Sequence, residues 1–323
     1  MTDPACSAKV AAVVIGRNEG DRLIRCLASL APDERRVIYV DSGSTDGSVN
    51  AAKQAGAEVI ELDMSIPFTA ARARNAGLEA ISENHSDSFV QVIDGDCEMQ
   101  PEWIGTAVSF LQTHKDVAMV SGRLRERFPE ATLWNRMADA EWDTPVGEVK
   151  AVGGIALLRL AAVQQVGGYR EDLIAGEEPE LGLRLRREGW RIWRLNSEMA
   201  LHDIAMTRFG QWWRRTARNG FAIAQSAHLH GRSDEKYRVA ETRRALFWGA
   251  GVPVMALLGA LWSPWLLSLL LLWPLQVVRL RSRNMGWTEA FFLTLGKIAE
   301  AQGVLQYAWQ VFTGKKKRLV EYK

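Results

Sequence analysis

The stretch Phe89-Val-Gln-Val-Ile-Asp-Gly-Asp-Cys97 decides the fold that this sequence predicts. Residues 89–93 are mostly apolar and rich in β-branched side chains, which is typical of a buried strand. The strand ends in two carboxylates, Asp94 and Asp96, which are separated by Gly95. Because glycine permits a tight turn, we expect both carboxylates to converge on one point at the strand's carboxyl end. Two hard oxygen donors there suit a divalent cation that bridges a diphosphate.

A helix is predicted directly after this turn. Pro101 suits a first helical turn, and Trp103, Ala107 and Leu111 follow at helical spacing. A strand, an acid pair and a helix in this order are typical of an open α/β sheet that binds its ligand at the strands' carboxyl ends. An isolated Asp-Gly-Asp is also typical of a solvated turn, so the rest of the chain must decide.

Composition allows one large domain, or one domain with an appendage, because the chain has 323 residues. The formal net charge is only +2, but arginine is frequent from Arg184 to Arg244, which favours an anionic partner such as phosphate or a membrane surface. Cys6, Cys26 and Cys97 form no CxxC or zinc spacing. We therefore expect a reducing compartment.

Strands and helices alternate through the first hundred residues. Apolar runs predict strands over residues 10–15, 37–40, 59–62 and 89–93. Helical spacing favours helices over residues 21–30, 49–55 and 69–80. This alternation implies a parallel sheet with helices on its faces.

Four motifs lie at the ends or beginnings of these elements. They are Asn18-Glu19, Asp41-Ser-Gly-Ser-Thr-Asp-Gly47, Arg74-Asn-Ala-Gly-Leu78 and Asp94-Gly-Asp96. In this order they resemble the nucleotide-sugar-binding half of the family 2 glycosyltransferases, which have the GT-A fold; Gly16 departs from the proline of many members. The resemblance implies a mostly parallel central sheet flanked by helices, with a catalytic domain over residues 1–235.

The resemblance also implies a site for a nucleotide-diphosphate sugar donor. In it, Asp94 approaches the ribose and Asp96 binds Mg²⁺ or Mn²⁺. Asp41 can accept an N–H from a nucleobase or cap its own turn. Arg74 can bind a base or a phosphate, or lie solvated on a helix face. The donor-binding set is Ile15, Arg17, Glu19, Asp41, Arg74 and Asp94.

A candidate general base lies in the segment from Ala175 to Leu181, which resembles the family's Glu-Asp segment with Glu178 in place of aspartate. At a helix amino end, the dipole favours a carboxylate that stays charged at neutral pH. Such a base can take a proton from an acceptor hydroxyl. Glu177 and Glu180 are alternatives for this role.

His202 is the second expected metal ligand, because it lies where many GT-A enzymes place a histidine near the diphosphate. The alternative is a structural histidine. Before it, residues 123–150 have no clear period; in the family this region often forms a mobile flap near the acceptor.

The acceptor side is expected to include Gly153, Gly154, Gln211 and Arg214. The two glycines lie inside a predicted strand over residues 151–158, so they indicate either close approach by a ligand or backbone, or a bulge. The segment from Gln211 resembles the Gln-x-x-Arg-Trp signature of processive members, but Arg215 replaces the tryptophan. This departure argues against a polymer-extending synthase, and an interfacial helix is the alternative.

The C-terminal region over residues 236–323 is expected to be membrane-associated. The run from Ala245 to Val278 has no charged residue and would span roughly 50 Å as a helix, against about 30 Å of hydrocarbon. Ser263-Pro264 interrupts it, and arginines flank both ends, so we expect a re-entrant or broken helical hairpin with cytoplasmic ends. A buried soluble hairpin is the alternative. Residues 287–312 read as an amphipathic surface helix, and Lys315–Arg318 could touch anionic lipid.

These features predict an inverting, metal-dependent glycosyltransferase at the cytoplasmic face of the cell membrane. Its acceptor would be a hydroxyl of a lipid-linked saccharide or another membrane acceptor in surface polysaccharide or glycolipid assembly, and no nucleic acid is expected as a partner. One alternative transfers sugar to a polyprenyl phosphate, which needs no base. A different class of protein would be an inactive membrane scaffold with the same fold.

Overall fold

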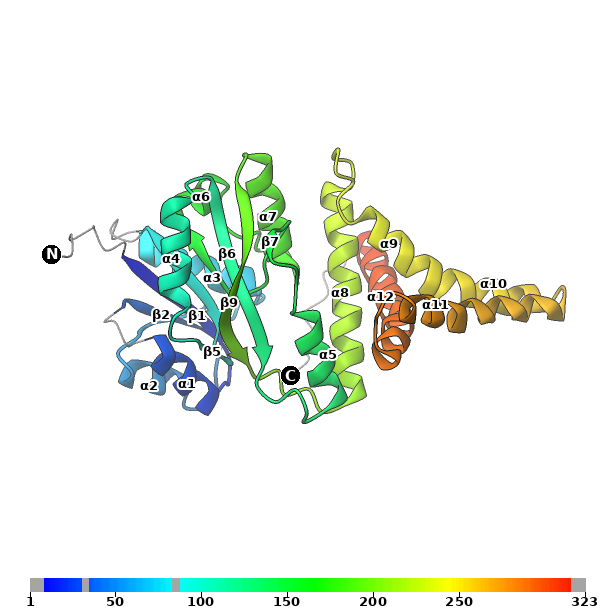
Figure 1. The fold of residues 1–323 in the computed structure, drawn as a ribbon, viewed down its shortest axis with the longest axis horizontal. Coiled ribbons are helices and arrows are strands. Elements are labelled where there is room, and N and C mark those ends of the chain that lie inside the picture. Colours follow the sequence, from blue (N-terminus) through cyan, green and yellow to red (C-terminus); the bar gives the residue numbers. More distant parts are fainter. Residues whose placement is uncertain (1–8, 31–34, 83–87, 315–323) are drawn as a thin grey trace. The chain divides into compact units, whose positions relative to one another are not determined.

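The central sheet of the protein carries the candidate site (Figure 1). The computed structural model describes residues 9–30, 35–82 and 88–314, so Cys6 and Lys315–Arg318 lie outside the described residues. Within the described part of the chain, nine strands form one sheet in the order β3-β2-β1-β4-β8-β6-β9-β5, with β7 paired to β9. The strands are β1 (Val10–Gly16), β2 (Val37–Asp41), β3 (Glu58–Glu61), β4 (Phe89–Asp94), β5 (Cys97–Met99), β6 (Val117–Glu126), β7 (Gly147–Glu148), β8 (Ala156–Arg159) and β9 (Arg191–His202).

The sheet is mixed. Strands β1 to β4 pair in parallel, as the alternation of strands and helices predicted. Strand β8 then joins β4 and β6 in antiparallel orientation, and β5 and β7 pair antiparallel with β9. The two longest strands, β6 and β9, are parallel and lie side by side in Figure 1.

Helices cover both faces of the sheet, which explains its continuous apolar strands. Alternate residues of β1 point to opposite faces: Ala12 and Val14 belong to one buried cluster, and Ala11 and Val13 to the other. The helices of this part of the chain are α1 (Asp21–Leu30), α2 (Ser48–Gln54), α3 (Ala70–Ser82), α4 (Trp103–Thr113), α5 (Leu133–Glu141), α6 (Leu160–Gln165) and α7 (Glu177–Arg187).

The chain divides into two compact units. Residues 1–173 and 177–205 form the first, and residues 174–176 and 206–323 form the second. We had expected the catalytic domain to continue to residue 235. Instead, the long helix α8 (Phe209–His230) belongs to the second unit, because it packs along the C-terminal helix α12 (Trp287–Thr313).

The contact between α8 and α12 depends on small residues. A side chain at Gly220 would lie 2.1 Å from the Glu300 carbonyl oxygen, and one at Gly303 would lie 1.9 Å from the Ala217 carbonyl oxygen. The absence of these side chains lets the two backbones approach closely. The predicted helix over residues 287–312 is confirmed as α12, which buries one face in the second unit and leaves large side chains such as Trp309 and Phe312 exposed.

The charge-free run forms a broken hairpin, as predicted. It comprises the π-helical η1 (Phe247–Gly251), α10 (Val252–Ala260), the 3-10 helix η2 (Pro264–Leu271) and α11 (Leu272–Arg281), preceded by α9 (Val239–Leu246). Helix α10 lies beside η2, and the chain reverses just before Pro264 (Figure 1). None of the helices that the structure describes combines the length and hydropathy needed to span a bilayer.

Candidate active site

The two carboxylates that follow β4 serve different partners. The Gly95 N–H donates to the Ile15 carbonyl at 2.8 Å and fixes the turn against β1. From this turn, Asp94 Oδ1 lies 3.0 Å from Arg74 Nη2, whereas Asp96 Oδ2 lies 3.3 Å from His202 Nε2. The two carboxylates therefore contact different partners, and their convergence on one point stays a prediction.

Asp96 and His202 form a group of possible metal ligands, as predicted. Strand β5 pairs with the end of β9 so that Cys97 lies opposite His202. Consequently one donor atom from each of Asp96, Cys97 and His202 lies within 4.8 Å of the others. Cys97 was not predicted, because its proximity depends on the pairing of β5 with β9, which the sequence pattern did not reveal.

The chemistry of this group fits Mg²⁺ or Mn²⁺. Burial raises the pKa of Cys97 well above its usual value, so its thiol is neutral and a poor ligand. A carboxylate and an imidazole remain, and adjacent ligands of an octahedral ion at about 2.1 Å lie roughly 3 Å apart. The 3.3 Å between Asp96 and His202 matches this spacing.

Arg74 forms ion pairs with three carboxylates next to the metal-ligand group. Its Nη1 lies 2.8 Å from Glu177 Oε1 and 2.9 Å from Glu178 Oε1, and its Nη2 contacts Asp94. Burial lowers the pKa of Arg74, but the three acidic charges outweigh burial and raise it well above normal. The guanidinium, only 2% exposed, is therefore always charged and is not solvated on a helix face.

Glu178 lies in the first turn of α7, as predicted, with its side chain 13% exposed. Burial, reinforced by the charge of Glu177 and opposed by Arg74, raises the pKa of Glu178 to about 7. The expectation of a charged carboxylate at neutral pH is therefore met only in part, because burial raises the pKa of Glu178 to about 7. A base with a pKa near 7 is well matched to proton transfer at neutral pH.

Glu180, the third candidate base, has a structural role. It is fully buried and accepts hydrogen bonds from Arg184, whose Nη2 also donates to the Gly168 carbonyl at 2.7 Å. Asn75 holds the same loop, since its side chain pairs with both backbone groups of Tyr169 at 2.8 Å. Asn75 and Arg184 thus fix the loop that leads into α7.

The expected nucleobase site is organised by the Asp41 turn. Asp41 is 2% exposed; its Oδ2 accepts from the Gly43 and Ser44 backbone, and its Oδ1 accepts from the Tyr39 hydroxyl at 2.9 Å. Asn18 joins this turn to β1, because its Oδ1 accepts from the Thr45 N–H at 2.7 Å. Asp41 therefore caps its own turn, and its contact with a base stays a prediction.

The other expected donor residues follow β1. Ile15 is the last residue of β1 that pairs with β4, opposite Asp94, and Arg17 follows the strand, partly buried. Glu19 is buried and pairs with Arg22 at 2.7 Å. These residues lie in the loop next to the Asp94–Asp96 turn, and their contact with a donor stays a prediction.

The expected acceptor residues divide between the two units. Gly153 and Gly154 precede β8 instead of lying inside a strand, because β8 begins at Ala156. A side chain at Gly154 would lie 2.6 Å from Arg74 Nη2, so this glycine makes room for the guanidinium. In the second unit, Gln211 Oε1 accepts from two backbone N–H groups at the start of α8, and Arg214 is exposed. Their acceptor role stays a prediction.

Trp142 lies at the metal-ligand group, although its segment showed no pattern in the sequence. It follows α5, and its indole stacks on the His202 imidazole with centroids 4.7 Å apart and planes 24° apart. No local sequence signal could have placed it there, because the contact joins two distant segments.

Known proteins resemble this chain over its first half. Residues 12–155 match the family model described as Glycosyl transferase family 2. The succinoglycan biosynthesis protein ExoA of Rhizobium meliloti (strain 1021) is 28% identical over 176 residues, which are 51% of this chain and 53% of that protein. The glycosyltransferase AglE of Haloferax volcanii is 23% identical over 196 residues, 57% of this chain and 63% of that protein. The chain thus aligns with about half to two thirds of these relatives.

The fold itself has a solved counterpart. The mannosyltransferase PcManGT from Pyrobaculum calidifontis, in complex with GDP-Man and Mn²⁺, superposes with a TM-score of 0.63 at 18% identity, covering 96% of this chain and 90% of that chain. The sheet and its strand-end carboxylates therefore define a glycosyltransferase fold of the GT-A class. Over residues 12–155, the chain resembles the family 2 glycosyltransferases.

Proposed function

We propose that the protein is an inverting, metal-dependent transferase that moves a sugar from a nucleotide-diphosphate sugar to a hydroxyl of a lipid-linked saccharide or other membrane acceptor. The observation that carries this proposal is the pairing of two functions around one turn. Asp96 and His202 present metal ligands, and Glu178 presents a buried base beside Asp94. Inversion rests on the family resemblance.

The residues would act as follows. Asp96 and His202 would hold Mg²⁺ or Mn²⁺, which offsets the charge on a leaving diphosphate when it is bound. The side chain of Asp94 is 36% exposed and is held by Arg74. It can accept a hydrogen bond from a hydroxyl group of the donor. Glu178 would take the proton of the acceptor hydroxyl as that oxygen attacks the anomeric carbon.

The relatives support this assignment. ExoA is named for succinoglycan biosynthesis and PcManGT was solved with GDP-Man and Mn²⁺, so a metal and a nucleotide sugar fit the fold. The polyprenyl phosphate alternative gives more weight to the basic stretch from Arg184 to Arg218. Within the first unit, its arginines at 184, 186, 191 and 194 bond to protein groups, which favours the hydroxyl acceptor.

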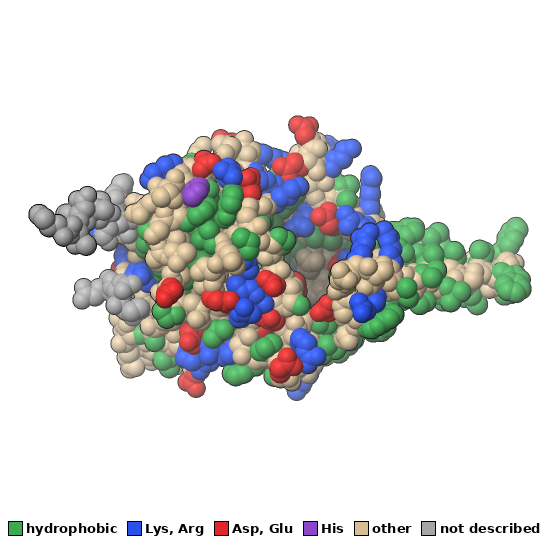
Figure 2. Space-filling model, viewed as in Figure 1, with side chains coloured by type: hydrophobic (Ala, Val, Ile, Leu, Met, Phe, Trp, Pro, Cys, Tyr) green, Lys and Arg blue, Asp and Glu red, His purple; other side chains and the backbone are tan. Residues whose placement is uncertain are grey.

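We also propose that the hairpin dips into the cytoplasmic leaflet. Its tip exposes Leu261, Trp262 and Trp265 by 86%, 92% and 85%. Figure 2 shows hydrophobic side chains along the arm and basic ones at its base, where α9 and α11 carry arginines in their last turns. The nine residues of α10 extend about 14 Å, roughly half of the hydrocarbon thickness.

A donor screen tests the enzymatic proposal. Purified protein would be incubated with GDP- and UDP-sugars and Mn²⁺, with and without EDTA, and nucleotide release would be measured with membrane lipid extract or with a polyprenyl phosphate as acceptor. We expect release from one donor that needs metal and is stimulated by the lipid extract. Release that is equal in EDTA would contradict metal dependence, and stimulation by polyprenyl phosphate alone would support the alternative acceptor.

Vesicle flotation tests the membrane proposal. The wild-type chain should float with vesicles containing anionic lipid, and L261E/W262E should remain in the dense fraction. Replacement of Phe128, an exposed hydrophobic residue of the first unit, by Glu is the matched control and should float. Equal flotation of the tip variant and the wild type would overturn the insertion of the hairpin.

A further inference from the structure

Trp142 covers one face of the expected metal ligand His202. Their ring centroids are 4.7 Å apart and their planes differ by 24°, while the His202 side chain is only 16% exposed. We propose that Trp142 is the positioning residue for His202, and that ion pairs from α5 to the sheet hold Trp142 in place. This inference rests on the proposed metal site of Asp96 and His202.

The stacking fixes the direction of the ligand atom. The lone pair of an imidazole nitrogen lies in the ring plane, and rotation of a histidine ring about its last side-chain bond is only weakly restricted. A flat indole against one face restricts that rotation. It therefore keeps His202 Nε2 directed toward Asp96 Oδ2, at 3.3 Å, before a cation arrives.

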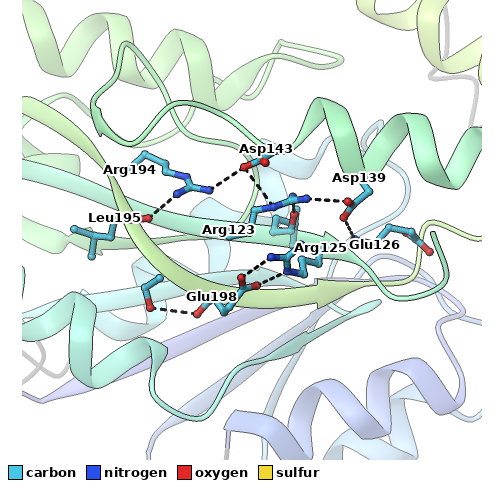
Figure 3. Close-up of polar contacts among 10 residues, drawn as sticks. Arg123, Arg125, Glu126, Asp139, Asp143, Arg194, Leu195 and Glu198 are labelled. Atoms are coloured by element: carbon cyan, nitrogen blue, oxygen red, sulfur yellow. Dashed lines mark hydrogen bonds and ion pairs between the residues drawn. The ribbon is translucent and has the colours of Figure 1, made fainter. Parts of the chain in front are cut away.

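Asp139 and Asp143 lie on either side of Trp142 in the sequence, and both contact arginines of the sheet (Figure 3). Asp139 Oδ2 lies 2.8 Å from Arg123 Nη2, and its Oδ1 accepts from the Glu126 N–H at 2.9 Å. Asp143 Oδ1 lies 3.4 Å from both Arg123 Nε and Arg194 Nη2. We call these contacts the α5 clamp.

The basic side of the clamp is rigid. The side chains of Arg123 and Arg194 are only 7% and 4% exposed, whereas that of Asp143 is 62% exposed. The pairing of β6 with β9 shifts register on both sides of Arg123, and such bulges re-aim side chains. Because Arg194 lies on the same strand as His202, the clamp and the histidine share one support.

The clamp is also built on a capped helix. Thr132 accepts a hydrogen bond from the Asn135 N–H at the start of α5, and Asn135 donates to Glu126 Oε1 at 3.1 Å. Glu126 in turn accepts from the Ile204 N–H at 3.1 Å, two residues after His202. Both ends of the segment are therefore anchored near the metal-ligand group, and Trp142 is held between them.

Mn²⁺ binding tests the proposal without requiring activity. Free Mn²⁺ would be counted by electron paramagnetic resonance in titrations of the full chain, with Mn²⁺ alone and with GDP or UDP. We expect W142A to bind Mn²⁺ about 10-fold more weakly, as for other residues that orient a metal ligand. W142F should bind within about twofold of the wild type, because a phenyl ring can also stack. W134A, in the helix α5 that precedes Trp142, is the matched control and should be unchanged.

The outcomes separate this inference from the metal proposal. If H202A binds Mn²⁺ like the wild type, the metal site itself is misassigned. If H202A loses Mn²⁺ but W142A binds it normally, the metal site stands and the positioning role of Trp142 is overturned. A weakened W142A together with a normal W142F and an unchanged melting temperature would support positioning, because a general loss of structure would also lower the melting temperature.

A second readout reports the distance directly. Paramagnetic Mn²⁺ quenches a nearby indole, whereas diamagnetic Mg²⁺ does not. We expect Mn²⁺ to quench part of the tryptophan emission of the wild type and of W134F. In W142F, most of this quenching should be absent. Equal quenching in W142F and the wild type would place the metal away from Trp142 and overturn the proposal.

Discussion

The two ends of the Asp94-Gly95-Asp96 turn differ in how the protein balances their charge. At one end, Arg74 lies among Asp94, Glu177 and Glu178, so one buried cation is shared by three carboxylates. At the other end, Asp96 lies beside a histidine and a neutral thiol. The first cluster contains its own cation, and the second presents ligands for one that comes from solution. The turn thus separates the proposed base from the proposed metal ligands.

Removing the metal end should have the largest effect. Asp96→Ala should reduce Mn²⁺-dependent donor binding and transfer to background, because even residues that only orient a ligand cost 10- to 100-fold. Mn²⁺ titration and nucleotide release would measure both losses. Asp116→Asn, an exposed carboxylate paired with Arg191, is the control and should be active; substantial Mn²⁺-dependent activity in D96A would refute the metal role.

Removing the base should separate binding from chemistry. Glu178→Gln should keep donor and Mn²⁺ affinity but lower the turnover by about 100- to 10,000-fold, the usual contribution of a positioned base. Single-turnover transfer and isothermal donor titration would be compared with Glu177→Gln. If E177Q is inactive and E178Q is normal, Glu177 is the base. If both are active, the acceptor brings its own anion.

Removing the shared cation, Arg74, should mainly lower the free energy of unfolding. Arg74→Met leaves three acidic groups around a buried gap, and breaking a buried ion pair costs about 3–5 kcal/mol. Arg74→Lys should cost less, because it keeps the charge but loses the fork that contacts several carboxylates. Urea unfolding would measure both, and Mn²⁺ affinity of the folded R74K protein should be nearly normal. Equal stability of R74M and the wild type would show that the carboxylates do not depend on Arg74.

The two ends of the turn also differ from their partners in how far the sequence predicts them: positions in the chain are predicted, but contacts between distant residues are not. Strands β1 to β4 and helices α1 to α4 follow from local periodicity, and the residues at these strand ends were predicted in their correct places, whereas the short strand β5 was not predicted. The partners of those residues were not predicted. Arg74 and Glu177, for example, are separated by 103 positions, and their contact depends on how α3 and α7 pack. The roles of Cys97 and Trp142 were missed for the same reason, because each is created by a contact with His202.

The smallest expected effect is a pH dependence of the transfer rate. It should arise at the end of the turn that carries Glu178, and not at the metal-ligand end. Burial raises the pKa of Glu178 to about 7, and a base acts only when deprotonated. Transfer should therefore rise with pH, reach half of its plateau near pH 7 and fall to roughly a tenth of it at pH 6. Mn²⁺-dependent donor binding should vary less over the same range, because Glu178 is not a ligand.

The same shift has the opposite sign for stability. A carboxyl whose folded pKa exceeds its unfolded value binds more protons in the native state, so its contribution is present below about pH 4.5 and is lost as pH rises toward 7. The wild type should therefore lose stability relative to E178Q between these values, in the interval where its activity rises. Melting temperatures of both proteins, measured from pH 5 to 8, would test this. A difference that is independent of pH, together with a wild-type rate profile that is flat near pH 7, would show that Glu178 does not titrate there and that the base lies elsewhere.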